Sequence, residues 1–567
     1  MIVGIDLGTT NSAVAIWKNS KPQLIANALG DFLTPSAVSL TESGEILVGM
    51  AARERQVTHP QSTATVFKRY IGTQQKTRLG RAEFSAEELS ALVLKSLKGD
   101  VEAATGESVT GAVITVPAYF NDRQRKSTKR AGELAGLRVE RLVNEPTAAA
   151  LAFGIQDRND KEPFLVFDLG GGTFDVSIVE VFDGIVEVRA SAGDNRLGGE
   201  DFNDALINLA RTRIDFDSQL GKIKPDILQE LLRDAAERAR RKLSENDSAS
   251  FSITAHDKAV TIEITSADFD ACAAPLLERL RQPVLRSLRD SDIAVASLSE
   301  IVLVGGSTRM PIVRKTITKM FGRFPNSRVH PDHAVALGAA AQAGLLASDS
   351  ALDEIRLTDV CPFTLGVEHA EYDGRGNFRH GLFSPIIERN TAIPASRVGR
   401  YRTISDNQRE VLMEIYQGEA RNVASNVKLG TLRVPVPPRP AGEVAIDCRF
   451  TYDPSGILDV DVTIPMNGTK RNLLIADDDS WTVEEIERRR QALEALKFHP
   501  REDAENVAIL SRAARCYESF IGPQRDQIGH WITQFEAALD SQDPRSIRET
   551  REQLLENLNA AEGERYL

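Results

Sequence analysis

The sequence predicts a multidomain chain in which a duplicated α/β domain is followed by a β-sandwich and a short helical domain. Short apolar strands alternate with helical patterns from residue 1 to about 350, which is typical of sheets covered by helices. Two similar hairpin sequences lie about 160 residues apart within this region, and this indicates an internal duplication. Beyond residue 360 the chain becomes rich in strands with Gly, Pro and Asn turns, and from Thr482 it becomes helical.

These changes of pattern divide the chain into four segments. We expect the α/β domain at residues 1–348, a linker at 349–359, the β-sandwich at 360–478 and the helical domain at 479–567. The clearest strands of the sandwich are Val411–Tyr416, Val444–Tyr452 and Ile457–Ile464. A capping box at Thr482 and Glu485 begins the helical domain, and breaks at Pro500, Gly522-Pro523 and Asp543-Pro544 separate about four helices.

The two hairpins have the composition of phosphate-binding turns. Val3–Asn11 reads V-G-I-D-L-G-T-T-N, and Val166–Asp175 reads V-F-D-L-G-G-G-T-F-D. In each, an apolar run ends in an aspartate, Asp6 or Asp168, and glycines let backbone amides approach an anion. We expect the two turns to close on one ligand, with the aspartates holding hydrated Mg²⁺. The groups predicted to bind its β- and γ-phosphates belong to Gly8, Thr9, Thr10, Asn11, Gly170, Gly171, Gly172 and Thr173.

Three further segments carry candidate ligand groups, and each has a structural alternative. Lys68 lies among apolar residues, so its amine can point inward to phosphate oxygens, although a surface position is usual for lysine. Glu145 lies at a strand-to-helix junction, where it can orient water or a hydrated metal, or simply favour the helix dipole. The glycine turn in Gly193–Phe202 suits either the approach of a ligand or close packing.

A polar stripe and a third glycine turn complete the candidate site. Glu237, Arg240, Arg241 and Ser244 follow i, i+3, i+4, i+7 spacing on one face of a helix. This face is either solvated or a nucleoside site, with guanidinium planes stacking on the base and the carboxylate accepting from ribose hydroxyls. Ile301–Pro311 reads as a strand, a glycine turn and a helix whose amides can face a ligand. Such a set can position a phosphoryl group and neutralise its charge without a covalent nucleophile.

Composition narrows the remaining function classes. The net charge of −12 argues against a nucleic-acid binder, because phosphate-backbone affinity requires clustered Lys and Arg. The four cysteines are widely spaced and match no metal site, which favours a reducing compartment. No signal segment and no apolar run long enough to span a bilayer is apparent. We therefore expect a soluble, cytoplasmic, monomeric protein that binds neither nucleic acid nor membrane.

Three long motifs make the chain resemble the DnaK-type (seventy-kilodalton heat-shock) chaperones. They are G-I-D-L-G-T-T-N-S from Gly4, D-L-G-G-G-T-F-D-V-S from Asp168 and V-L-V-G-G-S-T-R-M-P from Val302. The segments V-P-A-Y-F-N-D at Val116, N-E-P-T-A-A-A at Asn144 and L-G-G-E-D-F at Leu197 support them. The resemblance covers essentially the whole chain. It implies an actin-like ATPase domain, a β-sandwich that holds extended apolar peptides, and a helical lid.

The resemblance also implies roles for individual residues. Lys68 would stabilise the γ-phosphate and the attacking water, while Glu145, Asp168, Thr173 and Asp175 would place water and metal. The residues that would contact the nucleotide beyond its phosphates are Gly198, Gly199, Glu237, Arg240, Arg241, Ser244, Gly305, Gly306, Ser307, Arg309 and Asp332. Those that would couple the domains or engage a J-domain protein are Pro117, Arg125, Arg141, Asn144 and Asp359. Those that would line the peptide cleft are Val367, Ala370, Tyr401, Ile404 and Val411, with Ala370 and Ile404 forming an arch over the peptide.

The resemblance also implies particular ligands and partners. The cofactors would be ATP or ADP with Mg²⁺, with K⁺ as a further candidate cation. The partners would be unfolded or extended client polypeptides and a J-domain co-chaperone, with a nucleotide-exchange factor as a further candidate. The implied activity is ATP hydrolysis that drives protein folding work, as in a stress response.

Some features depart from the usual family pattern. The linker residues 355–359 read I-R-L-T-D instead of a leucine-rich run, so we expect weaker docking of the linker. The hairpin region between Ser244 and Ile262 is short, which disfavours the usual exchange factor. The short lid, F-S-P-I-I-E-R-N-T at Phe383 and S-A-G-D-N at Ser191 place the chain closest to the HscC-like branch. A small-molecule kinase or a filament-forming ATPase of the same superfamily is the alternative, but neither requires residues 360–567.

Overall fold

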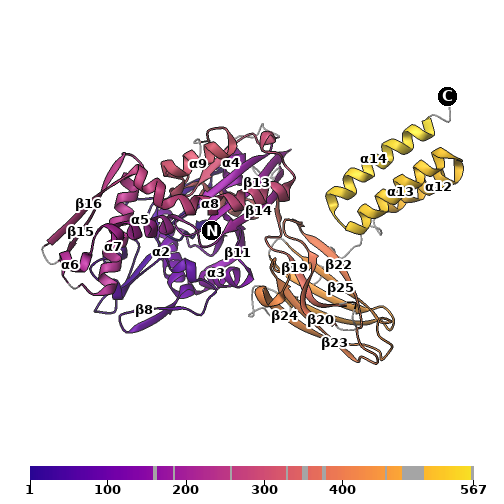
Figure 1. The fold of residues 1–567 in the computed structure, drawn as a ribbon, viewed down its shortest axis with the longest axis horizontal. Helices are drawn as coiled ribbons and strands as arrows, with labels where there is room; N and C mark the ends of the chain where they lie inside the picture. Colours follow the sequence, from indigo (N-terminus) through magenta and orange to yellow (C-terminus); the bar gives the residue numbers. More distant parts are fainter. Residues whose placement is uncertain are drawn as a thin grey trace. The chain divides into compact units, whose positions relative to one another are not determined.

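The structure is a computed structural model that describes residues 1–156, 162–182, 185–221, 223–255, 258–326, 330–347, 356–372, 374, 378–453, 456–475 and 504–563. These residues separate into two compact units, Met1–Phe363 and Thr364–Leu567 (Figure 1). The expected boundaries at residues 348 and 478, the start of the linker, the capping box of Thr482 and Glu485, and Pro500 lie outside the described residues.

The first unit is built on two mixed sheets that repeat one arrangement. The first sheet has the order β11-β10-β1-β2-β3, with the short β4 on β2. Its strands are β1 (Ile2–Asp6), β2 (Asn11–Lys18), β3 (Lys21–Ile25), β4 (Thr34–Pro35), β10 (Gly111–Val116) and β11 (Arg138–Asn144). β1 pairs antiparallel with β2 and parallel with β10. The first predicted hairpin is therefore β1–β2.

The second sheet contains the second hairpin in the same setting. Within the first unit its order is β17-β12-β13-β14-β18. The strands are β12 (Phe164–Leu169), β13 (Phe174–Phe182), β14 (Ile185–Asp194), β17 (Ile301–Val304) and β18 (Arg356–Val360). β12 pairs antiparallel with β13 and parallel with β17, as β1 does with β2 and β10. This repetition agrees with an internal duplication.

Two helices pack against each other between the sheets. α4 (Glu145–Gln156) follows the first sheet but packs on β12, β13 and β14 of the second. α10 (Ala334–Leu346) follows the second sheet but packs on β1 and β2 of the first. A Cβ at Gly338 would lie 1.7 Å from the carbonyl oxygen of Ala148, so only glycine allows this approach. α10 thus packs mainly on α4 and the first sheet.

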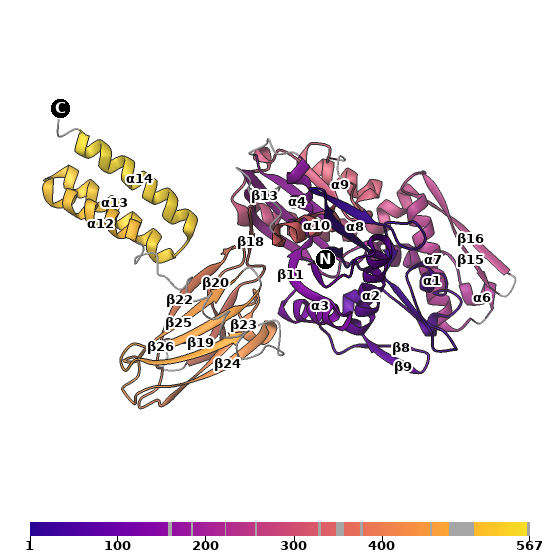
Figure 2. The same ribbon diagram turned by 180° about the vertical axis from the view of Figure 1, so that it is seen from behind.

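Other helices of the first unit also contact the two sheets (Figure 2). α2 (Ala86–Thr105) and α3 (Asp122–Leu134) contact strands of the first sheet, and α8 (Ser266–Ser291) contacts β13 and β14 of the second. The other elements are β5 (Ala37–Leu40), β6 (Ile46–Val48), α1 (Met50–Arg53), β7 (Thr63–Thr65), η2 (Phe67–Tyr70), β8 (Lys76–Leu79), β9 (Ala82–Ser85), α5 (Gly199–Arg213), α6 (Phe216–Leu220), α7 (Pro225–Lys242), β15 (Ser248–Ala255), β16 (Lys258–Thr265), η4 (Gly306–Arg309) and α9 (Pro311–Phe321).

The second unit begins with two four-stranded antiparallel sheets, β20-β19-β23-β24 and β22-β25-β26-β27. Their strands are β19 (Leu365–Tyr372), β20 (Phe378–Ile387), β22 (Ala395–Arg402), β23 (Glu410–Gln417), β24 (Val427–Pro435), β25 (Ala445–Tyr452), β26 (Leu458–Ile464) and β27 (Thr469–Ile475). The three strands expected from the sequence correspond to β23, β25 and β26. Both sheets contain completely buried residues, for example Ile415 and Phe450, as expected for a sandwich.

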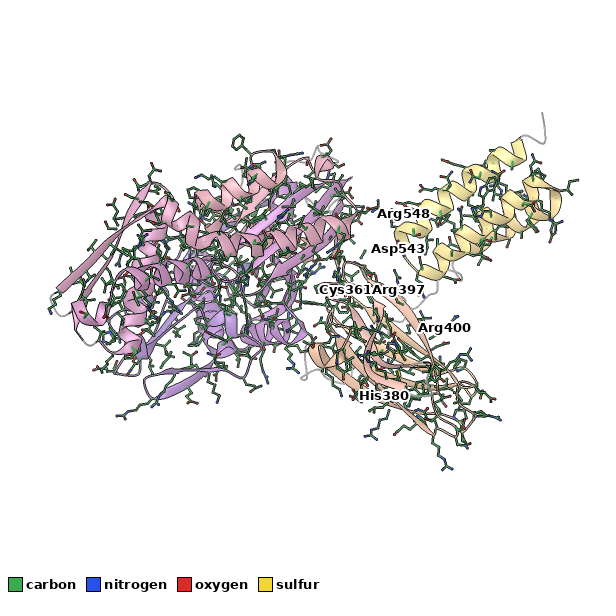
Figure 3. The ribbon with its side chains drawn as sticks, in the orientation of Figure 1. Cys361, His380, Arg397, Arg400, Asp543 and Arg548 are labelled. Carbon is green, nitrogen blue, oxygen red and sulfur yellow. The ribbon has the colours of Figure 1, made fainter. Side chains whose placement is uncertain are left out.

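Three described helices end the second unit: α12 (Ala504–Ser519), α13 (Pro523–Ser541) and α14 (Pro544–Gly563). The predicted breaks at Gly522-Pro523 and Asp543-Pro544 coincide with the starts of α13 and α14. The helices share a core around Ala513, Phe535 and Leu558. Among the described residues, no helix is both long and apolar enough to cross a membrane. All four cysteines are free, and Cys361 is buried with its thiol on the carbonyl oxygen of Phe363 (Figure 3).

Candidate active site

The first unit contains a cavity of about 690 Å³ between the two hairpins. The hairpin turns, the third glycine turn after β17 and the polar stripe of α7 all line it. The predicted residues that line it are Asp6, Gly8, Thr9, Thr10, Asn11, Lys68, Glu145, Asp168, Gly170, Gly171, Thr173, Glu237, Arg240, Arg241, Ser244, Gly305, Gly306, Ser307, Arg309 and Asp332. Four segments that are distant in sequence therefore face one cavity.

The two hairpin turns meet directly at this cavity. A Cβ at Gly171 would lie 1.8 Å from the hydroxyl oxygen of Thr10, so a larger residue would separate the turns. Gly198 and Gly199 lie behind the second turn, where the Gly199 amide donates to the Gly170 carbonyl at 3.0 Å. The Ser307 hydroxyl donates to the same carbonyl at 2.8 Å. Gly172, Gly198 and Gly199, which we expected to contact the ligand, are absent from the described lining and support the turn instead.

A buried lysine–glutamate pair lies at the same end of the cavity. Lys68 is on the short helix η2, which Phe67 anchors in the core, and its Nζ lies 2.8 Å from Glu145 Oε1. Glu145 is the first residue of α4, as the junction of strand and helix predicted. Only 2% of Lys68 and 7% of Glu145 are exposed, so neither is a surface charge.

Three aspartates surround this pair. Burial and the neighbouring Glu145 raise the pKa of Asp6 to about 7 and that of Asp175 to about 8, and burial also raises the pKa of Asp168. Asp175 pairs with Asp168 across the β12–β13 ladder and accepts from the Tyr119 amide at 3.2 Å. Asp175 thus lies behind Asp168 and is absent from the described lining of the cavity, so its expected role in placing water and metal stays a prediction.

The donor set fits a hydrated divalent cation. Four carboxylates are gathered around one ammonium group, which leaves an excess of negative charge that a bound cation would balance. The available donors are carboxylate and hydroxyl oxygens, the ligands that Mg²⁺ prefers. Among the described residues, no three His, Cys, Asp or Glu side chains converge closely enough to bind a metal directly. A cation here would therefore be held through water and through the phosphates of a ligand.

The raised pKa values give a testable pH dependence. An unfolded chain would have these carboxyl groups at a pKa of about 4, so the folded state holds more protons between pH 4 and 8. The stability that the groups contribute is complete below about pH 4 and is lost as the pH rises to about 8.

We expect the free energy of unfolding of the wild type, minus that of Asp175→Asn, to fall as the pH rises from 5 to 8, by up to about 1.4 kcal/mol per pH unit. Urea unfolding of the full chain measures this difference. The transition of the first unit is identified as the one that added Mg·ADP shifts, and its free energy is then measured without nucleotide. A difference that does not change with pH would contradict the expectation.

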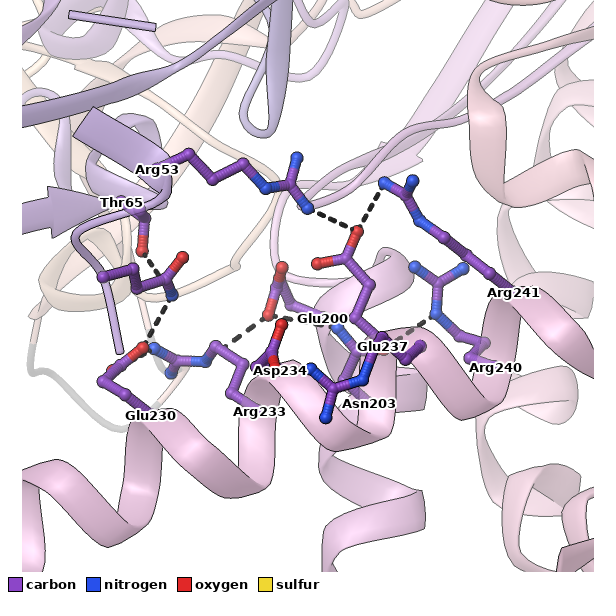
Figure 4. A network of polar contacts seen from close by, with 12 residues as sticks. Arg53, Thr65, Glu200, Asn203, Glu230, Arg233, Asp234, Glu237, Arg240 and Arg241 are labelled. Atoms are coloured by element: carbon purple, nitrogen blue, oxygen red, sulfur yellow. Dashed lines mark hydrogen bonds and ion pairs between the residues drawn. The ribbon is translucent and has the colours of Figure 1, made fainter. Parts of the chain in front are cut away.

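The other end of the cavity is an arginine-rich wall on α7 (Figure 4). Glu237 Oε1 accepts from Arg53 at 2.8 Å and from Arg241 at 2.6 Å. Burial alone would raise the pKa of Glu237, but the guanidinium groups of Arg53, Arg241 and Arg240 lower it overall. Arg240 Nε itself donates to the side-chain Oδ1 of Asn203 at 2.8 Å. The stripe is therefore the wall of a cavity and not a freely solvated face.

Sequence reasoning missed part of this wall. Arg53 is 184 residues away from Glu237 in the chain, and nothing in its local sequence distinguishes it from other surface arginines. A second contact joins the same segments, because Gln56 Nε2 donates to Glu230 Oε2 at 2.6 Å. Further lining residues that sequence reasoning missed are Asp31, Phe32, Leu33, Pro35, Met50, Glu245, Pro331, His333 and Val335.

The predicted coupling residues lie next to Glu145. Asn144 Nδ2 donates to Asp359 Oδ2 at 3.0 Å, and the Thr147 hydroxyl donates to the same oxygen at 3.2 Å. Arg125 Nη2 donates to Asn144 Oδ1 at 2.6 Å. Pro117, which follows β10, is buried, and Arg141 on β11 lies close enough to lower the pKa of Asp359 against the raising effect of burial. Residues 356–358 of strand β18 pair with β14, so this part of the linker is docked through its main chain.

The five predicted peptide-cleft residues are less closely grouped. Val367 pairs with Ser384 across β19–β20, and the Tyr401 hydroxyl donates to Ser384 Oγ at 3.0 Å. Val367 is completely buried, so it belongs to the core of its sheet. Ala370 lies in a bulge of β19, Ile404 follows β22, and Val411 is on β23. Their role as a cleft stays a prediction.

Glycine turns that meet around a buried lysine–glutamate pair and a set of oxygen donors define the first unit as a nucleotide-hydrolysing domain. A family model described as Hsp70 protein matches residues 2–80 and 73–566. Proteins named chaperone protein DnaK from Thermotoga maritima, Thermotoga neapolitana and Thermotoga petrophila are each 40% identical over 525 residues, which cover 90% of this chain and 86% of theirs. The chain belongs to the Hsp70 family of ATPases.

Proposed function

We propose that this chain is an ATP-dependent molecular chaperone whose first unit binds and hydrolyses ATP to control the capture and release of extended apolar peptides by the second. The observation that carries the proposal is the meeting of two glycine hairpins around the buried Lys68–Glu145 pair in a cavity large enough for a nucleotide. In this proposal the first unit has an actin-like fold, the two four-stranded sheets form a peptide-binding sandwich, and the C-terminal helices form a lid.

The geometry suggests a division of labour within the cavity. Amides and hydroxyls of the two turns, including Thr10 and Thr173, would hold the β- and γ-phosphates. Mg²⁺ held through water near Asp6 and Asp168 would supply charge neutralisation to the phosphates. Lys68 would face the γ-phosphate and the attacking water, while Glu145 fixes the position of the ammonium group.

The nucleoside would occupy the arginine-rich end. Arg240 and Arg309 would stack on the base, and the Gly305–Ser307 turn would approach it from the second sheet. Glu237 is already bound to Arg53 and Arg241, so its carboxylate would fix the arginines as well as meet the ribose. We therefore keep the prediction that Glu237 accepts hydrogen bonds from the ribose hydroxyls, and we add that it positions the arginine side chains.

The chain's partners follow from the same proposal. They are unfolded client polypeptides, a J-domain co-chaperone acting near Arg141, Asn144 and Asp359, and a nucleotide-exchange factor as a further candidate. The relatives' printed name, chaperone protein DnaK, supports a chaperone over a small-molecule kinase or a filament-forming ATPase. The assignment to the HscC-like branch remains a prediction from sequence.

The decisive test is whether nucleotide controls peptide release. A fluorescent apolar peptide bound to the full chain with ADP should dissociate faster when excess ATP is added, as stopped-flow fluorescence can measure. Release rates that are the same with and without ATP would remove the proposed coupling between the units. ATPase activity that a peptide and a J-domain protein together stimulate would support the same conclusion independently.

A substitution in the sandwich tests the position of the peptide cleft. We expect Val411→Phe to weaken peptide binding about tenfold, because the larger ring would fill the cleft, while basal ATPase activity is unchanged. Leu412→Phe is the matched control, since Leu412 is the next residue of β23, points to the opposite face and is 48% exposed. Fluorescence anisotropy of a labelled peptide measures both variants. Equal peptide affinity in Val411→Phe and wild type would show that the cleft lies elsewhere.

A further inference from the structure

Two histidines and a phenylalanine form an aromatic group at the cavity, and the proposed mechanism does not use them. The rings of His330 and His333 are stacked, with centroids 3.7 Å apart and planes 20° apart. The edge of the Phe32 ring meets His333 at a centroid distance of 5.9 Å. Phe32, from the loop between β3 and β4, and His333, directly before α10, both line the cavity. The group thus joins a loop of the first sheet to the segment directly before α10.

One contact in this group fixes a protonation state. Arg309 Nη2 lies 3.2 Å from His330 Nε2. A guanidinium group can only donate, so Nε2 must accept, and it can do so only in a neutral imidazole that carries its proton on Nδ1. Protonation of His330 would remove the acceptor and place a second positive charge beside Arg309.

The partner of His330 belongs to the proposed nucleotide site. Arg309 is on η4, lines the cavity and forms an ion pair with Asp332, which also lines it. His330 and Asp332 therefore hold one guanidinium group together. Asp31, from the loop between β3 and β4, is a further acidic residue that lines the cavity. Burial and the adjacent His330 lower the pKa of His333, which favours the neutral form of the His333 ring.

We propose that His330 is a positioning residue of the nucleotide site: its neutral ring holds Arg309 at the cavity, and a positive charge on the ring releases Arg309 and weakens nucleotide binding at acid pH. The inference rests on the proposed function, because it requires that the cavity binds the nucleotide.

The test compares wild type with His330→Gln at several pH values. The glutamine Oε1 can accept from Arg309 where Nε2 does, and it does not titrate. We expect the Kd for Mg·ADP of the wild type, divided by that of His330→Gln, to be close to one at pH 7.5. The ratio should rise to about five at pH 5.5, because a partly exposed charged contact is lost. The phosphates of ADP titrate equally in both measurements and cancel in the ratio.

Two further variants extend this comparison. Calorimetry on the full chain measures the Kd for Mg·ADP of the wild type and of every variant. His330→Lys carries a permanent charge and should bind Mg·ADP about fivefold more weakly than His330→Gln at every pH. His59→Gln changes an exposed histidine of the same unit that is absent from the described cavity lining, and it should keep the wild-type profile. A ratio that is constant with pH, or one that falls toward acid pH, would overturn the role of His330.

A measurement on the wild type needs no variant. Nitrogen-15 NMR of the imidazole groups at pH 7.5 should find His330 with its proton on Nδ1, and a proton on Nε2 would overturn the inference. If the wild type fails to bind Mg·ADP at pH 7.5, the proposed function fails and this inference fails with it. Binding of Mg·ADP with an unchanged ratio would instead leave the proposed function intact and remove only His330.

Discussion

The Lys68→Ala variant is expected to bind Mg·ADP but to hydrolyse ATP roughly 10²- to 10³-fold more slowly than wild type. Lys68 carries the ammonium group that faces Glu145 and the surrounding aspartates, and it lines the cavity where the two hairpins meet. In phosphoryl transfer, charge develops on the transferred group, so a cation fixed there acts mainly in the transition state. ADP lacks the γ-phosphate that Lys68 would face, and its binding should therefore persist.

The loss of Lys68 also leaves a buried carboxylate without its partner. Removing one member of a buried ion pair typically destabilises a protein by about 3–5 kcal/mol, so lost activity alone would not separate catalysis from folding. The double variant Lys68→Ala with Glu145→Gln removes the orphaned charge and should regain stability without regaining turnover.

The measurements for this prediction are single-turnover hydrolysis of ATP, binding of Mg·ADP and thermal melting. Lys76→Ala, which changes an exposed lysine of β8, is the matched control and should behave as wild type. Turnover in Lys68→Ala within tenfold of wild type would remove Lys68 from the role proposed for it.

The features that the sequence predicted well are those fixed by local chemistry. The hairpin turns, the start of α4 at Glu145 and the starts of α13 and α14 each follow from a few adjacent residues. Short-range rules of turn geometry and capping are sufficient for such features. The polar stripe of α7 was found for the same reason, since helical spacing places Glu237, Arg240 and Arg241 on one face. Ser244, the fourth predicted residue, lies in the turn after the end of α7 at Lys242.

The features that were missed depend on contacts between distant segments. Arg53 and His333 became cavity residues only because the fold brings α1 and the start of α10 to the same place. α4 continues through Gly154 to Gln156, because its packing on α10 and the second sheet outweighs the weak helix propensity of glycine.

The linker shows a third kind of limit. Its less apolar side chains predict weaker docking, and the strength of docking stays a prediction. What the sequence did not indicate is that residues 356–358 pair with β14 as part of strand β18. Pairing in a sheet uses backbone groups, which a pattern of side chains does not reveal. Asp359 then adds two side-chain bonds to the segment that carries Glu145, and this combination makes its role in coupling testable.

The Asp359→Ala variant is expected to reduce the acceleration of peptide release by ATP at least about tenfold, while ATP binding and peptide affinity with ADP stay close to wild type. The Asp359 carboxylate accepts from Asn144 at 3.0 Å and from Thr147 at 3.2 Å. Asn144 is adjacent in sequence to Glu145, which pairs with Lys68. A change at the γ-phosphate would therefore pass from Glu145 along the chain to Asn144 and Thr147, and through their hydrogen bonds to Asp359 on strand β18. Removing the carboxylate cuts this connection without touching the cavity.

The size of the expected effect follows from the contacts that are lost. Two hydrogen bonds to a charged group are worth about 1.5–3 kcal/mol each, which covers the usual range of coupling free energies between sites. Stopped-flow release of a labelled peptide, with and without ATP, measures the coupling directly. Asp359→Asn keeps one acceptor oxygen and should fall between alanine and wild type, whereas Thr358→Ala, which keeps the main-chain pairing of β18, should couple normally. ATP acceleration in Asp359→Ala equal to that of wild type would place the transmission between nucleotide and peptide sites outside Asn144 and Asp359.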